Sequence, residues 1–234
     1  MAYDIIQLMV EDHDNFIHLI ADRHTGDAMV VDPAWDADGI QQVLDEEGLA
    51  LTGILITHSH PDHVNAVEKL YYDGVTLFVP EAELPYWPDC PKDAVLVSDG
   101  DEIAFASTTI GVIATPGHTA GSVCYHIGQD LITGDTLFVY GAGRADLKGG
   151  DAQALYHSLQ KLKKLPPATR LWVGHHYGIQ EETTLAEQLA GNPFLMIDNE
   201  ADFIRYREDI AGKTRSMPYG PISHKELQHT LQEK

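Results

Sequence analysis

The sequence predicts an α/β protein, because short β-type runs alternate with amphipathic helical patterns and the length allows a sizeable core. The chain has 234 residues, of which 44% are hydrophobic and 22% charged, as in an ordinary globular domain. No internal repeat, low-complexity tract or linker divides it. We therefore expect a single domain over residues 1–234.

The first third of the chain predicts three strands and a helix. The expected strands are 5–6, 16–20 and 29–31. A helix is expected over 36–47, where Ile40 and Leu44 lie on one apolar stripe. Gly48 can close this helix, because glycine readily adopts the left-handed conformation common at helix ends.

The middle of the chain continues the alternation. A strand at 54–56 leads into a His-rich run, after which Val67 and Leu70 mark the buried face of a helix. A strand at 75–79 precedes a Pro-rich segment, 80–91, for which we expect irregular structure.

The second half predicts more strands and three helices. The expected strands are 110–114, 123–127, 131–132 and 171–173. Asp151 can cap a helix that runs to Lys164. Two further helical patterns, 183–190 and 200–211, make segment 180–234 a helical C-terminal extension.

The charge balance excludes some partners. Fifteen Lys and Arg stand against 36 Asp and Glu, which gives a net charge of −21. Such a surface repels phosphate backbones, so no nucleic-acid partner is expected. No apolar stretch approaches the length needed to cross a bilayer, so no membrane span is expected either.

The N-terminus and the cysteines indicate a cytoplasmic protein. Met1-Ala2-Tyr3-Asp4 lacks the basic region followed by an apolar one that marks a signal peptide. Cys90 and Cys124 lie far apart and form no CxxC pair, and Cys124 sits in an apolar strand-like run. Nothing in the cysteine pattern requires an oxidising compartment.

One short run predicts a metal site. Three imidazoles and a carboxylate fall within six residues, in His58-Ser59-His60-Pro61-Asp62-His63. In an extended segment His58 and His60 point to the same side, whereas Pro61 suits the first turn of a helix. Asp62 and His63 can then face a second point nearby. Imidazole nitrogen and carboxylate oxygen are ligands for zinc or iron.

Three later places repeat one pattern, in which a strand end and small residues are followed by a ligand-type side chain. These are His118 in Pro116-Gly117-His118-Thr119, Asp135 in Thr133-Gly134-Asp135-Thr136, and His175 in Val173-Gly174-His175-His176. Glycine beside such a residue lets the backbone approach closely. Four such places in one chain predict that these side chains converge.

With these residues in place, the chain resembles the metallo-β-lactamase superfamily, whose signature combines an HxHxDH run with later GHT, TGD and GH motifs. The resemblance extends from Asp32-Pro33 to about Phe194. It implies a four-layer αβ/βα sandwich with the active site along one edge of two packed sheets. It also implies that segment 180–234 borders the active site.

Within that superfamily the chain is most similar to the glyoxalase II-like hydrolases and the persulfide dioxygenases. The strings that carry this similarity are Gly134–Phe138, Gly143–Leu147, Gly149–Asp151, Thr183-Thr184 and Asn192–Leu195. The chain departs from the pattern at Ala145, where Thr is usual, and at His176-Tyr177, where Glu-Tyr or Asp-Tyr is often seen.

The resemblance implies two divalent metal ions, zinc by ligand type, with iron or manganese as alternatives. His58, His60 and His118 would hold the first ion. Asp62, His63 and His175 would hold the second. Asp135 would bridge the two ions, a residue that true β-lactamases of this fold usually lack.

The implied activity is hydrolysis of a small-molecule thioester similar to hydroxyacylglutathione. Two metals can share a water and lower its pKa to about 7, which gives a metal-bound hydroxide that would attack the carbonyl. Asp62 and Asp135 would be the catalytic carboxylates. Arg144 is a candidate for binding a substrate carboxylate, because guanidinium matches it in a bidentate fork. Tyr177 could line the thiol pocket.

Two alternatives use the same residues. A mononuclear iron persulfide dioxygenase would bind its metal through His58, His118 and Asp135 only. A lactone hydrolase or another ester hydrolase would use the same hydroxide. A binding module without activity is disfavoured, because all seven ligand positions are filled. A role behind the ligands stays open for His176.

Overall fold

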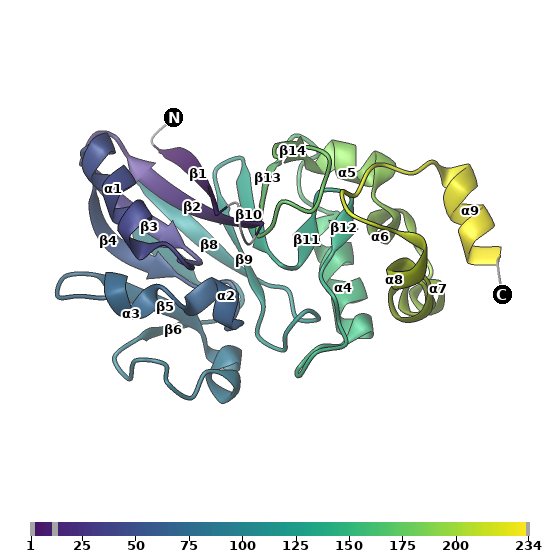
Figure 1. Cartoon of the computed structure of the whole chain (residues 1–234), viewed down its shortest axis with the longest axis horizontal. Helices are drawn as coiled ribbons and strands as arrows, with labels where there is room; N and C mark the ends of the chain where they lie inside the picture. The colour runs from purple at the N-terminus through teal and green to yellow at the C-terminus, as the bar shows by residue number, and fades with distance from the viewer. Residues whose placement is uncertain (1–2, 11–13, 233–234) are drawn as a thin grey trace.

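The computed structural model describes residues 3–10 and 14–232. Two six-stranded sheets pack face to face, and helices cover the outer face of each (Figure 1). The predicted α/β class and the four-layer sandwich implied by the resemblance are both confirmed.

The first sheet has the strand order β1-β2-β3-β4-β5-β6, with antiparallel pairing up to β3 and parallel pairing beyond it. Its strands are β1 (Asp4–Val10), β2 (Asn15–Asp22), β3 (Asp27–Val31), β4 (Ala50–Leu55), β5 (Thr76–Pro80) and β6 (Val95–Val97).

The second sheet has the order β14-β13-β10-β9-β8-β7, in which only β10 and β13 are parallel. Its strands are β7 (Glu102–Phe105), β8 (Thr108–Ala114), β9 (Val123–Ile127), β10 (Asp130–Gly134), β13 (Arg170–Val173) and β14 (Thr183–Thr184). A small hairpin joins β11 (Leu137–Phe138) to β12 (Gly141–Ala142).

Helices cover the two outer faces, and α9 lies at the far end of the molecule beside the C-terminus (Figure 1). On the first sheet they are α1 (Ala37–Glu47), α2 (Pro61–Val64) and α3 (Val67–Leu70). On the second sheet lies α4 (Ala152–Leu162), and α5 (Leu185–Gly191), α6 (Pro193–Met196), α7 (Glu200–Arg205) and α8 (Ala211–Thr214) pack beside it, followed by α9 (His224–Gln232). Among the described residues, no helix is both long enough and apolar enough to span a bilayer.

Alternation along the strands divides the apolar residues among three core layers. Along β2, Leu19 packs under the helices of the first sheet, whereas Ile20 faces the second sheet. Along β9, Tyr125 lies between the sheets, whereas Cys124 faces α4. This period of two is the reason that each sheet buries both of its faces.

The predicted caps of α1 and α4 agree with the structure, although α4 ends at Leu162 and not at Lys164. The Asp36 side chain accepts a hydrogen bond from the Gly39 amide at 2.9 Å, and Gly48 ends α1 with φ +67°. Asp151 caps α4 in the same way through the amide of Ala154. These caps satisfy backbone groups that have no partner inside a helix.

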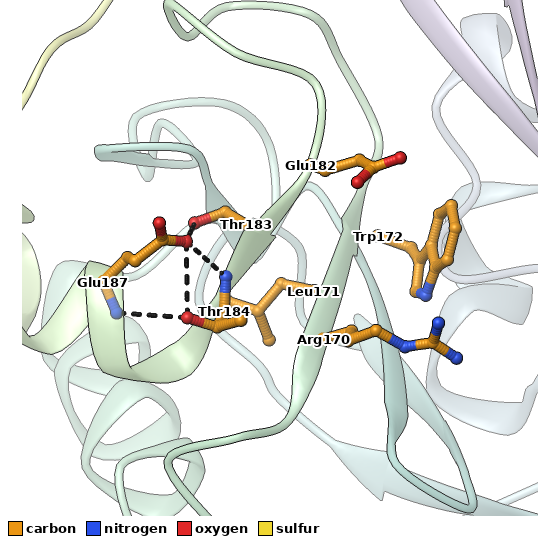
Figure 2. Close-up of a pocket in the computed structure, with 7 residues that line it drawn as sticks. All are labelled: Arg170, Leu171, Trp172, Glu182, Thr183, Thr184 and Glu187. Atoms are coloured by element: carbon orange, nitrogen blue, oxygen red, sulfur yellow. Dashed lines mark hydrogen bonds between the residues drawn. The ribbon is translucent and has the colours of Figure 1, made fainter.

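Three sequence expectations are wrong in detail. The helix predicted from 183 begins at Leu185, because Thr184 and Glu187 form a capping box and Thr183-Thr184 pair with β13 (Figure 2). The helix predicted over 200–211 contains a π-helical turn at Tyr206–Ile210. Segment 80–91 is not wholly irregular, since a 3₁₀ helix occupies Glu81–Tyr86.

The C-terminal segment shares its core with the rest of the second sheet. Phe194, Phe203 and Leu227 belong to the same buried cluster as Leu155 of α4 and Leu171 of β13. The segment also supplies β14, so it is built into the sandwich as well as extending it.

A buried histidine between the sheets gives a pH prediction. His18 is 2% exposed, and burial lowers its pKa to about 3. Below pH 6.5 His18 is protonated in the unfolded chain but stays neutral in the folded chain. The free energy of unfolding therefore falls as the pH drops. In His18→Gln, the free energy of unfolding should fall less steeply with pH than in the wild type, by up to about 1.4 kcal/mol per pH unit. Urea unfolding at pH 7 and pH 5 measures it, with His157→Gln as an exposed control.

Candidate metal centre

The seven ligand-type side chains come from five segments that meet at one edge of the sandwich. His58 and His60 follow β4, and His118, Asp135 and His175 follow β8, β10 and β13. Asp62 and His63 lie in α2, which Pro61 starts directly after His60. The strand ends and the helix start therefore place every candidate ligand at the same edge.

Three imidazoles form the first group. His60 Nδ1 lies 3.1 Å from His58 Nε2 and 3.0 Å from His118 Nε2. His58 and His118 are buried, whereas His60 is partly accessible. These three are the set that the resemblance assigns to a first ion.

Two imidazoles and a carboxylate form the second group. His63 Nε2 lies 3.2 Å from His175 Nε2, and Asp62 Oδ2 lies 3.4 Å from His175 Nε2. His63 and His175 are buried, but the Asp62 side chain is 36% exposed. These three are the set assigned to a second ion.

Asp135 lies between the two groups and faces both. Its Oδ1 is 3.4 Å from His63 Nε2 and 3.4 Å from His175 Nε2. Its Oδ2 is 3.5 Å from His118 Nε2. Each oxygen of one carboxylate is therefore directed toward a different group of ligands.

Outward hydrogen bonds orient the imidazoles. His118 Nδ1 lies 2.7 Å from the Arg144 carbonyl, and His63 Nδ1 lies 3.0 Å from Asp32 Oδ2. A carbonyl and a carboxylate only accept, so both Nδ1 atoms carry a proton, and in the neutral imidazole each Nε2 presents its lone pair inward. In that form the inward Nε2 atoms of His118 and His63 are acceptors that face the nitrogen and oxygen atoms of the other ligands.

This donor set fits divalent ions. Nitrogen ligands about 2.0–2.1 Å from a tetrahedral zinc lie about 3.4 Å apart, close to the separations within each group. Asp135 Oδ1 and His175 Nδ1 are buried atoms that find no hydrogen-bond partner among the described residues. A cation at each group would compensate the converging lone pairs and the unpaired oxygen.

The charges of the site are strongly coupled. Burial alone would raise the pKa of Asp135, but His175 and His63 outweigh it and hold that pKa well below its ordinary value. Burial lowers the pKa of His58 well below its usual range. Burial also acts to lower the pKa of His63, yet Asp135 and Asp32 raise it to about 9. With a pKa of about 9, His63 is protonated at neutral pH when no ion is bound, so a metal ion that binds its neutral imidazole would release a proton.

Two buried carboxyl groups behind the ligands were missed by the sequence reasoning. Asp32 accepts hydrogen bonds from the Thr57 amide and hydroxyl at 2.7 and 2.6 Å, besides its contact with His63. Glu83 is fully buried and contacts both Ser59 and Thr119. Neither belongs to a ligand motif, and Glu83 lies in the segment expected to be irregular.

The two predicted substrate residues lie close to the ligands. The Arg144 carbonyl contacts His118, but its guanidinium forms two 2.8 Å hydrogen bonds with Asp146 and is 56% exposed. Tyr177 stacks on His175 with ring centroids 4.7 Å apart and an interplanar angle of 6°. Arg144 is therefore already paired, whereas Tyr177 covers a ligand directly.

His176 does not join either group. Its ring packs edge-on against Phe16, and its amide donates to the Asp14 carbonyl at 2.7 Å. These contacts fix the backbone beside His175, so the neighbouring imidazole is directed toward the site.

A protein-family model identifies the superfamily of the chain. The model described as Metallo-beta-lactamase superfamily matches residues 12–175. The chain belongs to the metallo-beta-lactamase superfamily. The matched range contains all seven ligand-type side chains.

Relatives within the metallo-beta-lactamase superfamily cover most of the chain. A probable polyketide biosynthesis zinc-dependent hydrolase, BaeB of Bacillus velezensis, is 35% identical over 82% of this chain and 87% of its own. A hydroxyacylglutathione hydrolase of Methylobacillus flagellatus is 36% identical over 94% of this chain and 82% of its own.

A solved structure gives the same picture. ETHE1 from Myxococcus xanthus superposes with a TM-score of 0.80 and 32% identity, covering 89% of this chain and 91% of that one. The predicted resemblance to the glyoxalase II-like and persulfide dioxygenase branch is confirmed.

Proposed function

We propose that this chain is a hydrolase that holds two divalent metal ions, in the first instance zinc, and cleaves a hydroxyacylglutathione-like thioester. The observation that carries the proposal is the position of Asp135, whose two oxygens face the two ligand groups separately. A relative named as a zinc-dependent hydrolase and another named as a hydroxyacylglutathione hydrolase support it. In this proposal the enzyme acts in the cytoplasm on a small molecule.

The protein groups have distinct tasks in this proposal. Two ions held at such sites supply an acidified water and a Lewis acid for a carbonyl oxygen. Asp135 contacts both ligand groups and fixes their position relative to each other. Asp62 is the most exposed carboxylate of the site and accepts or steers the proton of the attacking water. Tyr177 presents an apolar ring face beside His175, against which a thiol chain can pack.

A variant of Arg144 tests whether this side chain binds a carboxylate on the thiol part of the substrate. Arg144 lines a cavity of about 410 Å³ together with Asp146 and Arg207. A substrate carboxylate would replace Asp146 in the bidentate pair. We expect Arg144→Ala to raise KM for a glutathione thioester about 10–100-fold, the value of a charged hydrogen-bond pair, and to leave a neutral thioester unchanged.

The partner of Arg144 provides the matched control. Asp146→Ala frees the guanidinium, so KM for the glutathione thioester should stay equal or fall. Equal losses with charged and neutral thioesters in Arg144→Ala would remove the assigned role of Arg144 while leaving the hydrolase intact.

A second function has a specific observation in its favour. The likeness to ETHE1 extends over most of both chains. A mononuclear iron persulfide dioxygenase would use His58, His118 and Asp135, of which Asp135 Oδ2 and His118 Nε2 are 3.5 Å apart. The proposed hydrolase uses all seven ligands instead.

One experiment separates these functions. Protein purified without added metal is analysed for zinc, iron and manganese, and then assayed on a panel of thioesters, lactones and simple esters. Two zinc ions per chain with preferred thioester cleavage is the expected result. One iron per chain, with oxygen uptake on glutathione persulfide and no hydrolysis, would overturn the proposal.

A further inference from the structure

Glu83 forms hydrogen bonds with a residue beside every ligand of the first group. Its Oε2 accepts from the amide and hydroxyl of Ser59 at 2.7 and 2.5 Å. Its Oε1 accepts from the Thr119 hydroxyl at 2.6 Å and from the Gly121 amide at 2.8 Å. Ser59 lies between His58 and His60, and Thr119 follows His118, so one buried carboxyl joins the two loops that carry the first group.

Asn15 makes the corresponding contacts to the second group. It is 2% exposed, and its Nδ2 donates to the Asp62 carbonyl at 3.0 Å. Its backbone forms an isolated antiparallel bridge with His175. Its Oδ1 accepts from the Trp35 indole at 2.8 Å. One buried residue therefore contacts the segment of Asp62 through its side chain and the segment of His175 through its backbone.

The contacts of the two residues do not overlap. Among residues 3–10 and 14–232, the hydrogen bonds of the Glu83 side chain go to the loops of the first group, and those of the Asn15 side chain go to Asp62 and Trp35. Asp32 differs from both, because it contacts His63 directly and reaches His58 through the Thr57 hydroxyl. Glu83 and Asn15 thus each contact the segments of one ligand group, whereas Asp32 contacts both groups.

We propose that Glu83 is the positioning residue of the first metal site and Asn15 that of the second, so that each site can be weakened without the other. The inference rests on the proposed two-metal function. It follows from geometry, since buried hydrogen bonds fix the loops from which the ligands project. Groups that hydrogen-bond directly to metal ligands change metal affinity about 10–100-fold when they are removed, and we expect an effect of the same order from residues that fix the ligand loops.

The test measures each site alone. His175→Ala leaves the first group as the complete site, and His118→Ala leaves the second. Glu83→Gln and Asn15→Ala are added to each background, and zinc affinity is measured by competition with a chromogenic chelator. The absorption spectrum of bound cobalt reports ligand geometry independently of activity.

The expected pattern is a crossed one. Glu83→Gln should weaken zinc about 10–100-fold in the His175→Ala background and less than threefold in the His118→Ala background. Asn15→Ala should do the reverse. Asp32→Asn should weaken both, and its left-handed backbone (φ +51°) is one that asparagine tolerates.

Milder variants cover the case of misfolding, which circular dichroism and melting would detect. Thr119→Val removes one Glu83 contact, and Trp35→Phe removes one Asn15 contact, so smaller losses with the same selectivity are expected. Equal losses in both backgrounds, or no loss in folded variants, would overturn the inference while the two-metal proposal stands. A wild-type chain that binds no zinc would instead remove the proposed function.

Discussion

Asp135→Asn should reduce kcat/KM for the thioester about 10³-fold, equivalent to about 4 kcal/mol of transition-state stabilisation. The substitution keeps the shape of the side chain but removes a negative charge surrounded by His63, His118 and His175. It also turns one of two inward acceptors into an N–H donor that faces imidazole ligands or a cation. Steady-state kinetics with metal analysis of the same samples measures the effect.

The control for this variant is the same chemical change at a carboxylate whose side chain caps a helix and does not face the ligand groups. Asp151→Asn preserves the N-cap of α4, because asparagine and aspartate cap helices equally well. It should retain wild-type activity. A folded Asp135→Asn enzyme that kept two ions and more than a tenth of its activity would show that Asp135 does not join the sites.

Removal of metal is expected to lower the melting temperature by about 10 °C or more. An ion at 1,000 times its Kd stabilises the folded chain by about 4.1 kcal/mol. For a chain of 150–250 residues each kcal/mol corresponds to about 2–4 °C. Without ions, the converging imidazole nitrogens and the buried Asp135 oxygen lose their partner. Scanning calorimetry before chelation, after it, and after zinc is restored measures the shift.

The ligands themselves provide the control for chelation. The double variant His118→Ala, His175→Ala removes one imidazole from each group, so its melting temperature should respond little to chelator or zinc. An equal response in the double variant and the wild type would place the stabilising metal elsewhere.

Much of the site could be anticipated because ligand chemistry is local in this sequence. The run from His58 to His63 and the turns at His118, Asp135 and His175 each pair a strand end with a ligand-type side chain. Sequence spacing alone does not say which residues form a group. The division into two groups came from the resemblance, and the structure brings the same residues together.

The positioning residues Glu83 and Asn15 could not be identified from local sequence motifs. Glu83 lies 24 residues from Ser59 and Asn15 lies 47 residues from Asp62, and neither belongs to a motif. A single carboxyl or amide is chemically ordinary until the tertiary fold places it among unpaired donors.

The fold shows the same division between periodic and local signals. Strands such as β2 and β9 are short apolar runs, and helices such as α1 and α4 have an apolar stripe and recognisable caps. The two-residue strands β11, β12 and β14 are too short for any period to show. The π-helical turn at Tyr206–Ile210 shares its sequence pattern with an ordinary helix.

Anomalous diffraction at the zinc edge from crystals of the zinc-loaded protein tests the central claim most directly. The account predicts two peaks, one among His58, His60 and His118 and one among Asp62, His63 and His175, with Asp135 in contact with both. A single peak held by His58, His118 and Asp135, or no peak at this edge of the sandwich, would contradict it.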